Sequence, residues 1–259
     1  MSDDEPTPPD PGIPGFWRRV FEAPARLLAL DYDGTLAPFQ VDRMAATPLP
    51  GIVEALRGIL RRCDTEVALI SGRPVDQVLA LLGELPVTII GAHGWEVRGP
   101  DGGRQDPPLG PGVTEALEQV WEALGDWQAR AEKKRASVAF HVRGMPLGAG
   151  ETAMSAVGRL WSELGPDLPL EYLAFDGGLE MRALGRHKGD AVQSLLVAAP
   201  AGALAVYVGD DLTDEDAFRA LEGRGVGIRV GAELRFSAAT GRLDDITAVR
   251  AFLEHWGRG

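Results

Sequence analysis

The sequence has a single cysteine and far fewer basic than acidic residues. With only Cys63 available, an internal disulfide is excluded, which fits a reducing compartment, and we expect a cytoplasmic protein. The chain has 26 Lys and Arg residues against 38 Asp and Glu, a formal net charge of -12. Such a charge repels nucleic acids and anionic membranes. An anionic substrate would therefore need a local basic patch or a bound cation.

Long hydrophobic runs are also missing. The longest apolar stretch, 195–208, is interrupted by Pro200 and Gly202 and is too short to span a bilayer. The first residues are acidic and proline-rich and lack the basic and apolar regions of a secretory signal, so we expect a disordered tail over 1–20. The 259 residues are 45% hydrophobic, which is enough for one large domain or two modest ones.

Short apolar strands alternate with amphipathic helices in the first part of the chain. Strands are predicted at 26–30, 66–70 and 87–94, and helices at 51–62 and 74–83. Strands alternating with helices are typical of a parallel sheet with crossover helices. The sequence therefore predicts an α/β fold.

A glycine- and proline-rich segment at 98–112 interrupts this alternation. After it, the strand at 137–143 and the two strands around a Gly-Gly turn in 168–183 predict an antiparallel sheet flanked by helices. Strand and helix alternation then returns from residue 187. We expect a parallel-sheet core formed by 21–100 and 178–259, with a smaller α+β domain, 101–177, inserted in it.

Polar residues end three of the predicted buried strands, and a lysine opens a helix. Because the carboxyl ends of parallel strands share one edge of the sheet, these groups should meet there. Converging carboxylates repel each other unless a hard cation lies between them, and Mg²⁺ is the usual cation where phosphate is handled. The residues are Asp31, Asp33, Ser71, Arg73, Lys188, Asp210, Asp211 and Asp214.

Four ordered motifs, DYDGTL (31–36), LISGRP (69–74), HKGDAV (187–192) and VGDDLTDEDAF (208–218), resemble those of the haloacid dehalogenase phosphatase superfamily. Three further segments, GAHGWEVR, KKRASVAFHVR and LEMRALGRHKGDAV, are similar to the trehalose-6-phosphate phosphatase family. The resemblance implies a Rossmann-like core with a C2-type inserted cap. It also implies Mg²⁺-dependent hydrolysis of trehalose 6-phosphate by a soluble enzyme, which we expect to be a monomer.

The same resemblance implies a role for each motif residue. Asp31 would attack phosphorus to form an aspartyl-phosphate, and Asp33 would protonate the leaving sugar oxygen and later activate water. Mg²⁺ would be held by Asp31, the backbone carbonyl of Asp33 and Asp210, with Asp211 or Asp214 in support. Phosphate would be bound by Ser71, Gly72 and Lys188, whereas Arg73 would either bind phosphate or cap the edge of the sheet.

The segment 130–143 is basic within this acidic protein. His141 and Arg143 are two residues apart on a predicted strand and so share a face. Planar polar side chains of this kind suit the paired hydroxyls of a sugar, and four residues match the family's cap pattern for sugar binding: Lys134, His141, Arg143 and Glu180. His93 and Glu96 either face the same cleft or order a turn.

Three alternatives remain open at this point. A related capped phosphatase could act on sucrose phosphate or a glycosyl-glycerate phosphate, and a phosphomutase belongs to the same class. A non-catalytic phospho-acceptor also combines an Asp, an acidic pair and a Lys on a parallel sheet. Such receiver modules are much shorter and lack an acid two residues after the acceptor, so Asp33 favours an enzyme.

Overall fold

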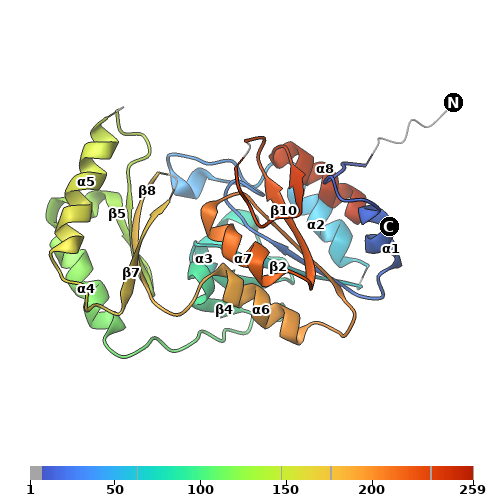
Figure 1. The fold of residues 1–259 in the computed structure, drawn as a ribbon, viewed down its shortest axis with the longest axis horizontal. Helices are drawn as coiled ribbons and strands as arrows, with labels where there is room; N and C mark the ends of the chain where they lie inside the picture. Colours follow the sequence, from blue (N-terminus) through green and yellow to red (C-terminus); the bar gives the residue numbers. More distant parts are fainter. Residues whose placement is uncertain (1–7, 63, 147, 176, 234, 259) are drawn as a thin grey trace.

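The computed structural model describes residues 8–62, 64–146, 148–175, 177–233 and 235–258, and it has two lobes, each with its own sheet (Figure 1). The large lobe holds a seven-stranded sheet in the order β11-β10-β9-β1-β2-β3-β4, parallel except for the β3–β4 pair. The small lobe holds a four-stranded antiparallel sheet, β5-β6-β8-β7. The predicted α/β core with an inserted α+β domain is therefore confirmed.

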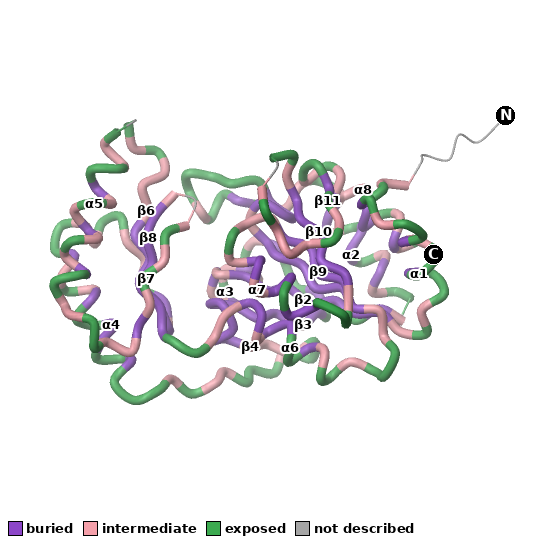
Figure 2. Tube along the Cα trace, in the orientation of Figure 1, coloured by how far each residue is buried: buried purple, intermediate pink, exposed green. Residues whose placement is uncertain are grey.

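The central strand of the large sheet is buried on both faces. Every residue of β1 (Arg26–Leu30) is buried because β9 and β2 flank it and helices cover both sides (Figure 2). Leu28 and Leu30 pack toward α2 and α8, whereas Leu27 and Ala29 pack toward α6 and α7. The other elements of this lobe are α1 (Phe16–Glu22), α2 (Ile52–Leu60), β2 (Thr65–Ile70), α3 (Val75–Leu82), β3 (Thr88–Gly91), β4 (Glu96–Arg98), α6 (Lys188–Ala198), β9 (Leu204–Gly209), α7 (Glu215–Ala220), β10 (Gly225–Val230), β11 (Gly241–Leu243) and α8 (Ile246–Trp256).

The small sheet turns one face to its own helices and the other to the large lobe. Val138 and Phe140 pack with Trp161 in the hydrophobic core of the small lobe. His141 and Glu180 lie on the opposite face, because successive strand residues alternate. The elements of this lobe are α4 (Val113–Ala123), β5 (Ala131–Lys133), β6 (Ser137–His141), α5 (Ala149–Ser162), β7 (Leu170–Phe175) and β8 (Gly178–Ala183).

Two predicted boundaries are corrected by the structure. The tail expected over 1–20 is wrong for its last part, because α1 begins at Phe16 and buries Phe16 and Val20 against α8. The boundary at 178 is also wrong: β8 pairs with β6 and β7, so the Gly-Gly turn is a hairpin within the small lobe. Residues 1–7 and Cys63 lie outside the described residues.

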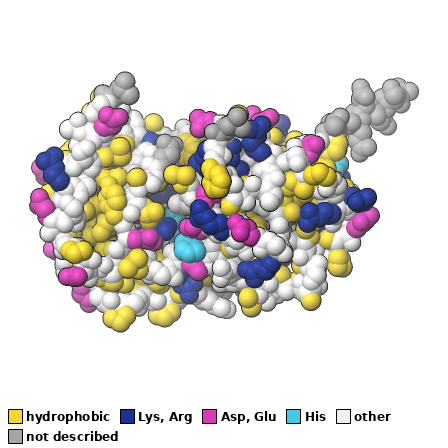
Figure 3. All heavy atoms as spheres, in the orientation of Figure 1, with side chains coloured by type: hydrophobic (Ala, Val, Ile, Leu, Met, Phe, Trp, Pro, Cys, Tyr) yellow, Lys and Arg dark blue, Asp and Glu magenta, His cyan; other side chains and the backbone are white. Residues whose placement is uncertain are grey.

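Many of the charged residues of the sequence are found on the surface of the protein. Acidic and basic side chains are interspersed over the face drawn in Figure 3. Among the residues that the structure describes, no helix is both long and apolar enough to cross a membrane.

Candidate active site

Three acidic side chains converge at the carboxyl edge of the large sheet. Asp31 follows β1 and Asp210 follows β9, and these strands pair in register through Leu30 and Val208. Asp214 ends the short 3₁₀ turn η4 (Leu212–Asp214) that follows. Carboxylate oxygens of Asp31, Asp210 and Asp214 lie within 4.8 Å of one another. The structure thus brings together acids that are distant in the sequence.

Lys188 balances part of this negative charge. Its Nζ donates hydrogen bonds to Asp31 Oδ1 and to Asp214 Oδ1, each 2.6 Å long. Burial alone lowers the pKa of Lys188, but Asp214 and Asp31 outweigh burial and raise it, so the ammonium stays charged. A buried lysine at the first residue of α6 is therefore fixed by two carboxylates.

One ammonium does not neutralise three carboxylates. Burial raises the pKa of Asp31 well above its usual range even with Lys188 beside it. Burial and the neighbouring Asp214 raise the pKa of Asp210 to about 8. A divalent cation among these oxygens would let the acids ionise together, and an all-oxygen set is what Mg²⁺ prefers. The donor set therefore fits a magnesium ion.

Gly34 is required beside this cluster. Its φ is 78°, a left-handed conformation that glycine adopts most readily. A Cβ at this position would lie 2.1 Å from Asp210 Oδ2, which is inside contact distance. Only a glycine lets the DYDGT turn and the Asp210 carboxylate approach so closely.

Asp33 lies apart from the acidic cluster and is held by Arg73. The Nε and Nη2 atoms of Arg73 donate to the two carboxylate oxygens of Asp33, both at 2.7 Å. Arg73 was expected either to bind phosphate or to cap the edge of the sheet. In the structure its guanidinium instead binds the carboxylate of the candidate acid, Asp33. Asp211 also stands outside the cluster, since its carboxylate accepts from the backbone N–H of Leu212.

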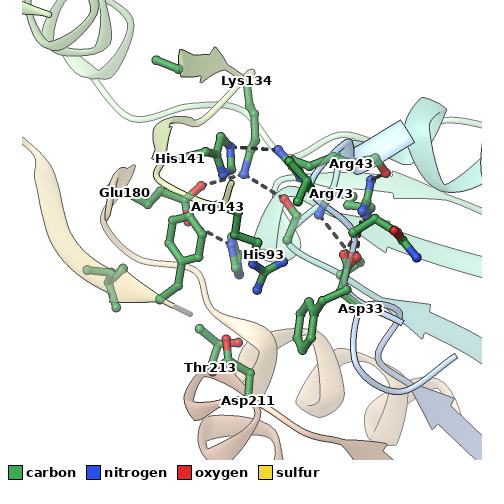
Figure 4. Close-up of a pocket in the computed structure, with 18 of the residues that line it drawn as sticks. Asp33, Arg43, Arg73, His93, Lys134, His141, Arg143, Glu180, Asp211 and Thr213 are labelled. Atoms are coloured by element: carbon green, nitrogen blue, oxygen red, sulfur yellow. Dashed lines mark hydrogen bonds and ion pairs between the residues drawn. The ribbon is translucent and has the colours of Figure 1, made fainter. Parts of the chain in front are cut away.

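The predicted sugar-binding residues line a cavity of about 680 Å³ together with Asp33 and Arg73 of the large lobe (Figure 4). Asp31, Asp33 and Lys188 line it from the large lobe. Such a volume is typical of small-molecule sites. The other predicted site residues among its lining are Ser71, Gly72, Arg73, Lys134, His141, Arg143, Glu180 and Asp211.

Glu180 is the centre of the small-lobe side. Lys134 Nζ donates to its Oε1 at 2.8 Å, Ser137 Oγ donates to the same oxygen at 2.7 Å, and His93 Nε2 lies 3.1 Å from Oε2. Burial favours the neutral acid, but Lys134 and His93 hold the pKa of Glu180 well below its usual range. Glu180 is therefore a buried carboxylate that residues of both lobes fix in place.

His93 and Glu96, for which two roles were left open, have different roles in the structure. His93 lines the cavity and contacts Glu180 from a backbone with φ 55°, which is rare for a residue with a side chain. Glu96 instead accepts from the N–H of Val75 at 2.8 Å, at the start of α3, and pairs with Arg104. Glu96 orders the fold, whereas His93 belongs to the site.

Sequence reasoning missed two charged residues between the lobes. Arg43, in the 3₁₀ turn η1 (Arg43–Ala45), forms an ion pair with Glu132 of β5 and lines the cavity. Neither residue belongs to a motif. The one available signal was Glu132 itself, an acidic residue inside the basic segment 130–143. Arg182, two residues after Glu180 on β8, pairs with Glu171 at 2.6 Å.

Comparisons with known proteins agree with this geometry. The chain is 35% identical over 245 residues to an "uncharacterized glycosyl hydrolase" of Mycobacterium tuberculosis, covering 86% of this chain but only 18% of that protein. It is 30% identical over 229 residues to a "probable trehalose-phosphate phosphatase" of Sinorhizobium fredii, covering 87% of this chain and 85% of the relative.

The solved structure of the C-terminal domain of Candida albicans trehalose-6-phosphate phosphatase has a TM-score of 0.85 at 21% identity and covers 98% of this chain and 99% of its own, which supports the fold. The family model described as trehalose-phosphatase matches residues 29–244, which include both strand-end acidic motifs and the whole small lobe. The chain belongs to the trehalose-phosphatase family.

Proposed function

We propose that this chain hydrolyses trehalose 6-phosphate to trehalose and phosphate, with Mg²⁺ and through an aspartyl-phosphate on Asp31. The observation that carries the proposal is the single cavity with two chemically different walls. One wall offers Asp31, Asp33 and Lys188, which suit a phosphate group, and the other offers Lys134 and Glu180, which suit sugar hydroxyls. A phosphorylated disaccharide presents both kinds of group.

In the first step, a carboxylate oxygen of Asp31 forms a bond to phosphorus while the bond from phosphorus to the sugar oxygen breaks. Asp33 donates a proton to the departing oxygen, and it can do so from one oxygen while the other keeps its bond to Arg73. Asp33 then removes a proton from the water that attacks phosphorus and releases Asp31. Lys188, beside Asp31, neutralises charge on the phosphate.

Asp31, Asp210 and Asp214, together with the backbone carbonyl of Asp33, would hold Mg²⁺. An anionic nucleophile that approaches a phosphate is repelled by about 1 kcal/mol at ~4 Å even in water, and by more in a drier cavity. When bound, Mg²⁺ offsets this repulsion and neutralises developing charge. The same ion would explain why several buried acids share this edge.

Phosphate release from a panel of substrates tests the proposal. Trehalose 6-phosphate, sucrose 6-phosphate and glucose 6-phosphate are compared with and without Mg²⁺. We expect the highest kcat/KM for trehalose 6-phosphate, by a factor of about 10 or more if Glu180 and its neighbours bind the second sugar, and loss of turnover with EDTA. Equal values across the panel would contradict the substrate, and full activity in EDTA would contradict the metal.

A further inference from the structure

Arg43 joins the two lobes through its side chain. The guanidinium forms an ion pair with Glu132 of β5, and its Nη1 lies 3.2 Å from His141 Nε2 of β6. Because arginine can only donate, His141 Nε2 accepts, which needs a neutral ring. Burial and the nearby Arg43 lower the pKa of His141 to about 3, so the ring is neutral at physiological pH. Both small-lobe partners therefore accept from the same arginine.

The backbone of Arg43 contacts the group that grips Asp33. Arg73 Nη1 donates to the Arg43 carbonyl at 2.9 Å, while its Nε and Nη2 bind the Asp33 carboxylate. Contacts thus run without a break from Glu132, through Arg43 and Arg73, to Asp33 (Figure 4 shows the part from His141 to Asp33).

The turn that carries Arg43 is also tied to the large lobe, because the buried Ala46 packs in its core and the Ala46 N–H donates to the Arg43 carbonyl at 3.4 Å. Asp42 accepts from the N–H of Met44 at 2.9 Å within the turn, and Tyr32 Oη donates to the Ala46 carbonyl at 2.8 Å. Arg73 itself is buried, so its direction depends on the groups that its nitrogens meet. One of these groups is the carbonyl of Arg43, the residue whose side chain the small lobe holds.

We propose that Arg43 is a positioning residue that couples closure of the small lobe to the orientation of the general acid. With the lobes together, Glu132 and His141 hold Arg43, whose carbonyl holds Arg73, which aims the Asp33 carboxylate. With the lobes apart, these contacts to the small lobe are lost, and the Arg43 carbonyl that Arg73 binds is held only by contacts within the large lobe. Proton donation by Asp33 is then efficient only when the small lobe covers the substrate. This inference rests on the proposed role of Asp33.

The leaving group distinguishes this role from direct substrate contact. An alkoxide needs a proton to depart, whereas p-nitrophenolate departs readily without one, so a misplaced acid slows the first step, formation of the aspartyl-phosphate, only for esters with poor leaving groups. Hydrolysis of the aspartyl-phosphate is common to all esters, so the first step has to be measured by itself. An arginine that touched phosphate would be needed for both kinds of ester. An arginine that touched the sugar would act mainly through KM.

The experiment measures KM and, by rapid quench, the rate of aspartyl-phosphate formation of Arg43→Gln for trehalose 6-phosphate and for a series of aryl phosphates. We expect this first-step rate to fall about 10- to 100-fold for trehalose 6-phosphate and to change less than about threefold for p-nitrophenyl phosphate. The dependence of rate on leaving-group pKa should become steeper. Arg250→Gln is the matched control, because Arg250 lies on α8 and pairs with Glu254, and it should match the wild type.

A charge exchange tests the contact with the small lobe. Arg43→Glu and Glu132→Arg should each show the steeper leaving-group dependence, and the double variant should recover at least about tenfold of the lost rate, because the ion pair is rebuilt. If Arg43→Gln does not fold, Glu132→Gln applies the same test from the other lobe.

Several results would overturn the inference. Equal losses of the first-step rate for all esters, with an unchanged slope, would assign Arg43 to phosphate binding or to stability, and a change in KM alone would assign it to the sugar. A double variant no more active than the single variants would show that the ion pair between residues 43 and 132 does not contribute to the rate. If the wild type cleaves aryl phosphates but not trehalose 6-phosphate, the proposed substrate fails, while the aryl series still decides the role of Arg43.

Discussion

The two walls of the cavity are built in different ways. Asp31 and Asp210 extend from paired parallel strands of a rigid sheet, and Lys188 is fixed between two carboxylates of its own lobe. Glu180, in contrast, is held by Lys134 of its own lobe and by His93 of the other. Apart from the orientation of Asp33, the phosphate-facing wall is therefore complete within the large lobe, whereas the sugar-facing wall is complete only when both lobes meet. Changes to the two walls should differ in size and in kind.

The largest effect is expected for Asp31→Asn. Without a carboxylate nucleophile the proposed covalent route is closed, and kcat should fall by ~10⁵-fold or more for every phosphate ester. Phosphate release and trapping of a phosphorylated enzyme measure the effect. Asp167→Asn, on the exposed surface of the small lobe, is the control. Residual turnover within about tenfold of wild type would rule out the proposed nucleophile.

Gly34→Ala tests the close packing of the DYDGT turn against Asp210 in the large-lobe wall. The new methyl group would press on Asp210 and shift the acidic cluster, so we expect kcat to fall about 10²-fold or more and the dependence on Mg²⁺ to weaken. Gly202→Ala is a matched control, because its φ of 79° imposes the same backbone strain with no atom within 4 Å of the added Cβ. Similar losses in both variants would mean that backbone strain, rather than the contact with Asp210, is responsible.

Glu180→Gln tests the wall that both lobes complete. Losing the charge should weaken disaccharide binding and raise KM for trehalose 6-phosphate about 10- to 100-fold, since a hydrogen bond to a charged group is lost. Turnover of p-nitrophenyl phosphate, which has no sugar, should change less than about threefold. Glu163→Gln, on the surface after α5, serves as the control. A parallel loss for both substrates would place Glu180 in phosphate chemistry instead.

The smallest effect concerns stability and pH without substrate. Asp31 and Asp210 have folded-state pKa values above those of the unfolded chain, so the metal-free protein binds extra protons between about pH 4 and the Asp210 value of about 8. Below about pH 6.5, His93 and His141 oppose this effect because burial lowers their pKa values. The melting temperature should therefore fall as pH rises from about 6.5 to 8. Mg²⁺ at ~100 times its Kd should raise Tm by about 5–10 °C, and by more at pH 8 than at pH 5.

Calorimetry across this range measures both effects. In Asp210→Asn, Tm should lose most of its response to Mg²⁺ and part of its pH dependence, because one carboxyl group with a raised pKa is gone. A metal-free protein whose Tm is unchanged or rises between about pH 6.5 and 8 would contradict the raised pKa values of Asp31 and Asp210. An equal Mg²⁺ shift at pH 5 and pH 8 would show that the ion does not displace protons from these acids.

The same contrast explains what the sequence could predict. The strand 26–30 and the acids beside it were predicted because a short apolar run and the polar residues that end it are local signals. The strand β4 was missed because its three residues follow a turn with little apolar pattern of their own. The helix α1 was missed because its aromatic residues become a core only against α8.

The site followed the same rule. The acids that meet at the sheet edge could be inferred from strand order, because parallel strands place their carboxyl ends side by side. Arg43 and His141 are 98 positions apart and no strand pairing links them, so their contact could not be inferred. The grip of Arg73 on Asp33 also depends on side-chain directions that no periodicity encodes.

The chain passes between the lobes twice, and the two passages are unequal. The first, through 99–112, is long and partly attached to β4 through Gln105. The second joins β8 directly to α6 through the few residues 184–187, so Glu180 and Lys188 lie on nearly continuous elements. An insertion in the first passage leaves both walls intact, whereas one added residue in the second would alter their spacing. Natural variation in length within this family should therefore accumulate in the first passage and avoid the second.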